Sequence, residues 1–175
     1  KVPVENLIGE ENKGWTYAKF LLAHERAGIA GVARSKKAIE RIKQIAATEM
    51  SYGEPLIQDP AFIRKIADAE LELTALEYTE LRTLAKDAAG KGPGAESSIL
   101  KIKGTDLQQR ITELCMEAVG YYANPHTGTT LSNEYVGPDY ATNLSGTYFN
   151  FRKASIYGGS NEIQRNIIAK MVLGL

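Results

Sequence analysis

The chain has 175 residues, of which 43% are apolar and 24% charged, and its 21 basic residues balance 21 acidic ones. This composition is normal for one globular domain with a sizeable core, and the absence of a long block of either charge argues against a nucleic-acid partner. No apolar run approaches the ~20 residues of a membrane span, and the start carries no cleavable-signal pattern, so we expect a cytoplasmic protein. The single cysteine, Cys115, lies in the apolar run ITELCMEAVG, where we expect a buried thiol rather than a reactive one.

The first residues, KVPVENLIGEENKGW, begin with Lys rather than Met and alternate apolar with polar side chains. Alternation with a period of two is typical of a β-strand, although no partner strand follows in the sequence. We therefore expect residues 1–12 to be the end of a preceding β-domain or a linker, with a short strand remnant. The chain would then be a fragment whose preceding part was removed.

A helical period begins at Gly14. Apolar residues spaced by three and four predict one long helix over 14–49: Trp15, Ala18, Leu22, Ile29, Val32, Ile39, Ile42 and Ile45. The run SYGEPLIQDP, with one glycine and two prolines, ends this helix. A second helix is predicted over 61–89. A third is predicted over 95–121, and its buried face consists of Leu100, Leu107, Ile111, Leu114 and Ala118.

Residues 122–148 are rich in Gly, Pro, Asn, Thr and Tyr and predict a long loop, of the kind that is more often functional or interfacial than idle. A short helical piece near 149–156 and a last helix over 161–173 complete the chain. Four substantial helices with short early connections favour an all-α fold, an antiparallel up-down four-helix bundle over 13–175.

Glu25 is the residue that fits the apolar face of the first predicted helix least, because Leu22 and Ile29 flank it there. Removing a carboxylate from water raises its pKa, in the direction that a proton-abstracting base near neutral pH needs. The alternative is a structural acid that is buried but paired, with an arginine such as Arg26 or with a lysine. The adjacent His24 projects from another side of the helix and is expected to be a surface or packing residue.

A metal site is not indicated. A di-iron bundle needs Glu-x-x-His on two helices, and neither histidine of this chain has a glutamate three residues before it. Acids of the second predicted helix, such as Asp68 and Glu72, alternate with basic residues and favour a solvated, salt-bridged face.

Three stretches resemble one family, the flavin-dependent acyl-CoA dehydrogenases, in its carboxy-terminal helical domain: VPVENLIGEENKGW, HERAGIAG and IYGGSNEIQRNIIAKMVLGL. They span nearly the whole chain in the family's order. The resemblance implies α,β-dehydrogenation of an acyl-CoA thioester, in which a glutamate takes the α-proton and the β-hydrogen leaves as hydride to FAD. It also implies that an electron-transfer flavoprotein accepts the electrons, and that a helical domain and a β-domain precede this chain.

In this family the base most often follows the Tyr of the IY segment, and that position is Gly158 here. A second group of members carries the base before the Arg of the first long helix, which corresponds to Glu25. The resemblance thus implies that Glu25 is the base, that Arg26 and Tyr157 contact the substrate, and that Gly158 leaves room for the thioester. The aspartate that many members place three residues before this arginine is Ala23 here.

Cofactor contacts are implied at Tyr52, Gly53, Gly159, Ser160 and Glu162. Two positions depart from the family pattern for flavin binding. Glu49 stands where an arginine facing the pyrophosphate is expected, and Pro60 where a glutamine is expected. A carboxylate would repel a pyrophosphate rather than attract it.

The family makes these pyrophosphate and glutamine contacts across its subunit interface, and we expect a homo- or hetero-oligomer through the helical bundle. The loss of the contacts favours a subunit paired with an unlike partner, as in bacterial members resembling pimeloyl-CoA dehydrogenase large subunits. The fragment alone is then expected to be inactive. One alternative is a non-catalytic structural subunit of a heteromeric acyl-CoA dehydrogenase, in which Gly158, Glu49 and Pro60 mark a decayed site. Another is a helical interaction domain unrelated to this chemistry, since a bundle does not itself imply an activity.

Overall fold

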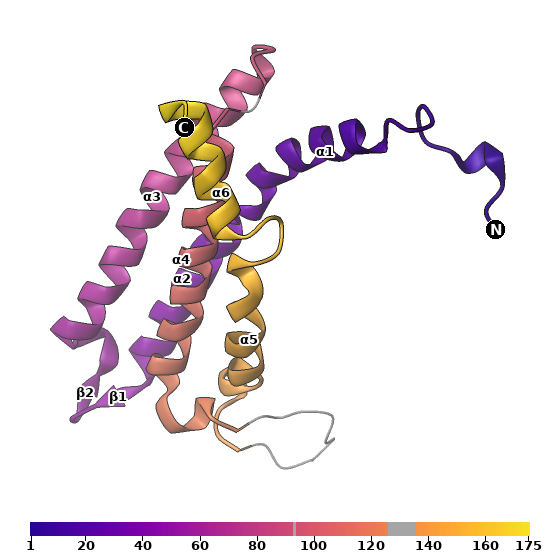
Figure 1. Cartoon of the computed structure of the whole chain (residues 1–175). Helices are drawn as coiled ribbons and strands as arrows, with labels where there is room; N and C mark the ends of the chain where they lie inside the picture. The colour runs from indigo at the N-terminus through magenta and orange to yellow at the C-terminus, as the bar shows by residue number, and fades with distance from the viewer. Residues whose placement is uncertain (93, 126–135) are drawn as a thin grey trace.

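The computed structural model describes residues 1–92, 94–125 and 136–175, and of residues 23–27 it describes the backbone alone. Helices dominate the described part (Figure 1). They are α1 (Gly14–Ile29), α2 (Val32–Thr48), α3 (Pro60–Ala88), α4 (Glu96–Val119), α5 (Leu144–Phe151) and α6 (Asn161–Ile168), which a π-helical turn, Ala169–Leu173, continues. Two short antiparallel strands, β1 (Met50–Ser51) and β2 (Glu54–Pro55), form a hairpin between α2 and α3.

Helix α4 is the centre of the bundle, because it contacts α1, α2, α3, α5 and α6. The helices α2 and α3 run side by side, and α5 and α6 follow one another along the opposite side of α4 (Figure 1). The predicted apolar faces of α2 and α4 are confirmed, because Ile39, Ile42 and Ile45 of α2 and Leu100, Leu107, Ile111, Leu114 and Ala118 of α4 are all buried. Of the apolar positions that the same spacing predicts on α3, five are buried, Phe62, Ile66, Ala69, Leu73 and Leu76, but the sixth, Leu84, is 50% exposed. The bounds of α3 and α4 lie within two residues of the predicted ones.

The long first helix predicted over 14–49 is wrong, because the chain breaks it between α1 and α2. Gly31 has a φ of 64°, in the left-handed region that glycine adopts without steric cost. The side-chain Nε2 of Gln108 donates to the carbonyl oxygens of Ile29 at 2.9 Å and Ala30 at 3.1 Å, which satisfies acceptors at the end of α1. The apolar spacing continues across this break, so the sequence pattern alone did not reveal it.

A close approach of α1 to α4 accompanies the break. Gly104 is buried, and a Cβ built there would lie 2.5 Å from the Cα of Ala30. Ala30 itself is fully buried. Only a residue without a side chain allows the two backbones to meet at this distance, so Gly104 fixes where α1 crosses α4.

The strand expected within residues 1–12 is also wrong. All of these residues are described, and they contain a single 3₁₀ turn, Val4–Asn6. A strand needs a partner for its backbone groups, and β1 and β2 pair only with each other. The start of α1 extends away from the bundle (Figure 1), and Trp15, expected on a buried face, is 71% exposed.

The C-terminal part follows the predictions with one shift. Helix α5 begins five residues before the predicted start at 149, so the predicted loop over 122–148 is shorter than expected. Residues 126–135 of that loop lie outside the described residues. The last helix is confirmed, and the Ser160 hydroxyl caps it by accepting from the backbone N–H of Ile163. Within the described residues, no helix is both long and apolar enough to cross a bilayer.

Candidate functional site

The site is built around a tight turn, residues 157–160, between α5 and α6. Gly158 and Gly159 have φ values of 66° and 85°, which an L side chain rarely adopts. A Cβ on Gly158 would lie 2.6 Å from Cδ1 of Ile29. The two glycines therefore let the 157–160 turn pack directly on the end of α1, which is distant from it in sequence.

Lys101 of α4 ties both ends of this turn to the bundle. Its side chain is fully buried, and Nζ donates to the carbonyl oxygen of Ser155 at 2.9 Å and to Oδ1 of Asn161 at 2.7 Å. Nδ2 of Asn161 in turn donates to Oδ1 of Asp106 at 3.1 Å. Burial lowers the pKa of Lys101, and the nearby carboxylates of Asp106 and Glu162 partly offset this shift.

Gln164 of α6 contacts the backbone of the turn. It is almost fully buried, and its Nε2 donates weakly to the carbonyl oxygens of Gly158 at 3.4 Å and Gly159 at 3.5 Å. Its Oε1 is buried and lacks a hydrogen-bond partner among the described residues. A buried acceptor without a partner is uncommon and calls for an explanation such as a bound ligand or water.

A small cleft of about 260 Å³ opens where α1, α2, α4 and the turn meet. Its lining residues are Gly28, Ile29, Arg34, Gln108 and Tyr157. Of the predicted substrate-binding residues, Tyr157 lies in this cleft and Gly158 lies against Ile29 at its edge. The cleft therefore joins the 157–160 turn to the C-terminal end of the first helix.

The side chains of Glu25 and Arg26, the predicted base and its neighbour, lie outside the described residues. Their backbone belongs to α1, and position 25 precedes Ile29 by one helical turn. The apolar stripe on which the prediction for Glu25 rests is only partly buried: Val32 is buried, whereas Leu22 is 37% exposed. The role of Glu25 and the environment of its carboxylate therefore stay predictions.

The predicted cofactor residues fall into two places. Gly159, Ser160 and Glu162 belong to the turn and the start of α6, whereas Tyr52 and Gly53 form the tip of the β1–β2 hairpin, at the far end of the bundle (Figure 1). The chain does not bring the two groups together. The hydroxyl of Tyr140 donates to Oε1 of Glu49 at 2.8 Å beside this hairpin, and burial together with that bond raises the pKa of Tyr140.

The exposed carboxylate of Glu162 has a lowered pKa because its own backbone N–H and the Ser160 hydroxyl bond to it. This residue lies in the first turn of α6, where the helix dipole favours a negative charge. The start of α6 is therefore a polar, charge-stabilising part of the site.

Sequence reasoning missed the polar residues that hold the site. Lys101, Thr105 and Gln108 are buried, and with Gly104 they recur at spacings of three and four on the inner side of α4. The same periodicity that identified Leu100 and Leu107 contained this signal, because polar residues at core positions are uncommon. Within the described residues, no group of three or more His, Cys, Asp or Glu could hold a metal ion.

Comparisons with known proteins agree with this arrangement. The family model described as acyl-CoA dehydrogenase, C-terminal domain, matches residues 12–173. Acyl-CoA dehydrogenase FadE26 of Mycobacterium tuberculosis is 31% identical over all of this chain and 43% of its own length. The short-chain specific acyl-CoA dehydrogenase of Megasphaera elsdenii is 28% identical over 94% of this chain and 40% of its own length.

Solved structures show the same fold. Butyryl-CoA dehydrogenase of Megasphaera elsdenii matches with a TM-score of 0.77 and 23% identity, over 98% of this chain and 42% of that one. The ChsE4–ChsE5 complex of Mycobacterium tuberculosis matches with a TM-score of 0.76 and 26% identity, over 99% of this chain and 44% of that one. The chain thus spans less than half the length of these relatives. With the fold, the order of its helices and the family model in agreement, the chain belongs to the acyl-CoA dehydrogenase family, in which it corresponds to the C-terminal domain.

Proposed function

We propose that this chain is the C-terminal domain of an FAD-dependent acyl-CoA dehydrogenase in which Glu25 removes the α-proton of an acyl-CoA thioester. One observation carries the proposal: the two left-handed glycines seat the 157–160 turn against Ile29, one helical turn beyond Glu25. In the common form of the family a base follows the tyrosine of this turn. Position 25 belongs to the helix whose last residues, Gly28 and Ile29, line the same small cleft.

The cleft residues suit a thioester. Tyr157 and Arg34 line it, and Arg34 adds a positive charge, whereas the room expected beside Gly158 is taken by Cδ1 of Ile29. A cation near the thioester carbonyl would stabilise the negative charge that develops as the α-proton leaves. Arg26, adjacent to Glu25, is proposed as a second contact with the substrate.

The residues of the 157–160 turn suit contact with the ring system of FAD, whereas those at the β1–β2 hairpin do not suit the FAD pyrophosphate. The turn offers a glycine backbone without side chains, the Ser160 hydroxyl and an unpaired buried acceptor on Gln164. FAD, when bound, would supply the acceptor for the β-hydride. At the hairpin, Tyr52 and Gly53 are exposed, but the nearby carboxylate of Glu49 is engaged by Tyr140 and opposes a pyrophosphate.

The partners proposed are an electron-transfer flavoprotein and further subunits that pack through the bundle. The ChsE4–ChsE5 neighbour is a complex of two chains, which supports a heteromeric assembly here. Another neighbour comes from a structure named for an electron-transferring flavoprotein of Acidaminococcus fermentans. The resemblance to pimeloyl-CoA dehydrogenase large subunits stays a prediction.

A non-catalytic structural subunit is the second candidate function. The observation that favours it is the pairing of Glu49 with Tyr140, because a hairpin that repels pyrophosphate would leave flavin binding to another subunit. In that case the bundle would serve assembly, and replacement of Glu25 would not change turnover.

The test uses the full-length protein, expressed with its neighbouring genes, and the variant Glu25→Gln. We expect the variant to retain its yellow flavin and to lose flavin bleaching by acyl-CoA by about 10²- to 10⁴-fold, the usual contribution of a general base. The matched control is Glu11→Gln, an exposed acid just before α1, which should react normally. Normal bleaching by Glu25→Gln would remove Glu25 from the mechanism and favour the structural subunit.

A further inference from the structure

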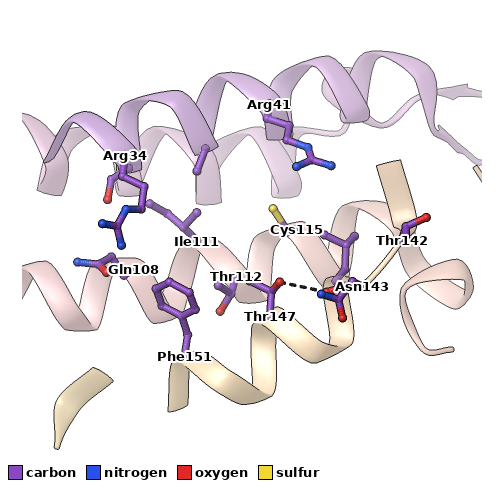
Figure 2. Close-up of a pocket in the computed structure, with 13 residues that line it drawn as sticks. Arg34, Arg41, Gln108, Ile111, Thr112, Cys115, Thr142, Asn143, Thr147 and Phe151 are labelled. Carbon is purple, nitrogen blue, oxygen red and sulfur yellow. Dashed lines mark hydrogen bonds between the residues drawn. The ribbon is translucent and has the colours of Figure 1, made fainter. Parts of the chain in front are cut away.

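A second, larger pocket lies between α2, α4 and α5, and Arg34 is the only one of its described lining residues to which the proposed reaction gives a role. Its volume is about 320 Å³, within the usual range for small-molecule sites. It adjoins the small cleft through Arg34 and Gln108, which line both. Figure 2 shows Arg34 and Arg41 on the α2 side of this pocket, with Cys115 and Ile111 on α4 and Phe151 and Thr147 on α5.

The charged side chains that line this pocket are all basic. Arg34 and Arg41 are seven residues apart on α2, two helical turns, so they lie along the same side of the helix. No aspartate or glutamate is among the described residues that line the pocket. Nη2 of Arg41 donates to the carbonyl oxygen of Tyr140 at 3.3 Å, which still leaves guanidinium donors for another group.

The pocket also contains a buried hydroxyl that lacks a hydrogen-bond partner among the described residues, and a bound ligand would supply one. Ser35 lines the pocket beside Arg34 and is only 2% exposed. Its Oγ is buried and has no hydrogen-bond partner in the part of the chain that the structure describes. Buried polar groups are almost always paired, so an unpaired hydroxyl next to a guanidinium suggests an oxygen ligand that is bound in use.

The remaining wall is apolar, with Ala38, Ile111, Leu144 and Phe151 the principal contributors. An inorganic anion would leave this wall unused. A ligand with a charged end and a short apolar body would use both parts of the pocket.

We propose that this pocket binds a small organic carboxylate with an aliphatic or aromatic body of roughly six to ten heavy atoms, a size chosen to match a pocket at the lower end of the small-molecule range. Arg34 holds the carboxylate, the Ser35 hydroxyl beside it donates to it, Arg41 adds positive charge from the other end of the pocket, and the body lies along Ile111 and Phe151. The site shares Arg34 and Gln108 with the one proposed for acyl-CoA, but its ligand differs, because a thioester carries no free carboxylate at its reacting end.

Cys115 provides a built-in reporter for the pocket. It is the only cysteine in the sequence, and it lines the pocket wall. Burial raises the pKa of its thiol, which the positive charge of Arg41 partly offsets. Alkylation of the thiol is therefore slow but specific to one place, and a ligand in the pocket shields it.

The experiment measures the rate of Cys115 alkylation by iodoacetamide in the present chain, with hexanoate, hexan-1-ol or hexylamine added. We expect hexanoate to slow the reaction at least fivefold and to saturate. The neutral alcohol should require at least about tenfold higher concentration, since the charge-assisted hydrogen bonds are lost, and the amine should have no effect. Equal protection by hexanoate and hexan-1-ol would overturn the proposal, as would no protection by either.

Variants locate the effect. Arg34→Met should weaken hexanoate about tenfold, because it loses a charge-assisted bond, and Arg41→Met should weaken it about threefold, because only a nearby positive charge is lost. The matched control is Lys37→Met, an exposed cation of α2 that does not line this pocket and should leave affinity unchanged. Equal weakening by Lys37→Met would show general charge attraction and overturn the proposal.

Ser35→Ala tests the hydroxyl. The Ser35 hydroxyl has no partner to lose within the described part of the chain, so the variant should fold normally, as circular dichroism would show. It should bind hexanoate about threefold more weakly, which corresponds to the low end of a hydrogen bond's contribution. None of these measurements uses flavin or turnover, so they are independent of the role of Glu25.

Discussion

The 157–160 turn and the tip of the β1–β2 hairpin are both short loops with two consecutive residues at positive φ, yet the rest of the molecule treats them differently. The turn is fixed at Ser155 and Asn161 by buried Lys101 and rests on Ile29. At the hairpin tip Tyr52 is fully exposed, and a Cβ on Gly53 would meet no atom within 4 Å. The two loops thus share a backbone conformation, and they differ in their tertiary contacts. Those contacts hold the 157–160 turn in one position, as a site requires.

This contrast has an energetic side. A residue at positive φ costs about 1–2 kcal/mol unless it is glycine, and the turn uses glycine at both such positions whereas the hairpin uses Tyr52 at one. Glycine at the turn also permits close contact with α1, which the hairpin tip does not need. The turn therefore combines low local strain with strong tertiary restraint, the combination expected where a substrate must be positioned accurately.

The largest effect is expected at Gly104, the crossing that places α1 beside the turn. Gly104→Ala should lower the free energy of unfolding by about 2–3 kcal/mol, because its Cβ would collide with the backbone of Ala30 and overpacked backbone cannot yield cheaply. The matched control is Gly28→Ala, a helical glycine of α1 with open space around its Cβ, which should raise stability by about 0.5–1 kcal/mol. Urea unfolding of both variants measures the difference, and a loss of less than 0.5 kcal/mol in Gly104→Ala would show that the crossing is loose.

Lys101 comes next in expected size. Lys101→Met should cost about 2 kcal/mol, since it leaves the Ser155 carbonyl and the Asn161 side chain without their buried donor. The matched control is Lys103→Met, which replaces an exposed lysine two residues further along α4 and should stay within about 0.5 kcal/mol of the natural chain. Hydrogen exchange should also be faster at the backbone N–H groups around 156–160 in Lys101→Met and not in Lys103→Met. A general loss of stability would instead speed exchange throughout the chain.

The pH dependence of that difference has a definite sign. Because burial lowers the pKa of Lys101, the unfolded chain binds more protons than the folded one between that lowered pKa and the ordinary value of 10.5. The natural chain should therefore gain stability relative to Lys101→Met as the pH rises through this window. Below the window the difference should be constant. A relative loss with rising pH would show that the ammonium is stabilised rather than penalised by its site.

Gly158 tests the contact between the turn and α1. Gly158→Ala should cost about 1–2 kcal/mol from its positive φ, and more from the collision with Cδ1 of Ile29. The double variant Gly158→Ala with Ile29→Val removes that methyl group, so it should recover part of the second cost. A double-mutant cycle by urea unfolding measures the recovery. Full additivity of the two changes would mean that the turn and α1 do not touch in solution.

How far the sequence predicts this molecule depends on the range of the interaction. The faces of α3 and α4 follow from local periodicity, because burial in a bundle repeats with the helical period. The break at Gly31 does not, since it is fixed by Gln108, which lies 77 residues later in the sequence, and the apolar spacing runs through it unchanged. The resemblance implies a functional role for the 157–160 turn, but the contact of this turn with Ile29 and its anchor on Lys101 are long-range contacts that no local pattern encodes.

The smallest effect is expected at the hairpin tip, and its sign is opposite to that at the turn. Tyr52 has a φ of 51° and is fully exposed, so Tyr52→Gly would relieve strain without removing any packing. The gain, however, is reduced by the greater freedom that glycine has in the unfolded chain, which leaves a net change of about 0 to +1 kcal/mol in the free energy of unfolding. Urea unfolding would measure it beside Gly158→Ala, the equivalent change in the opposite direction. A loss of 1 kcal/mol or more in Tyr52→Gly would mean that the aromatic ring makes a stabilising contact in solution, and the difference between the two loops would then be one of degree.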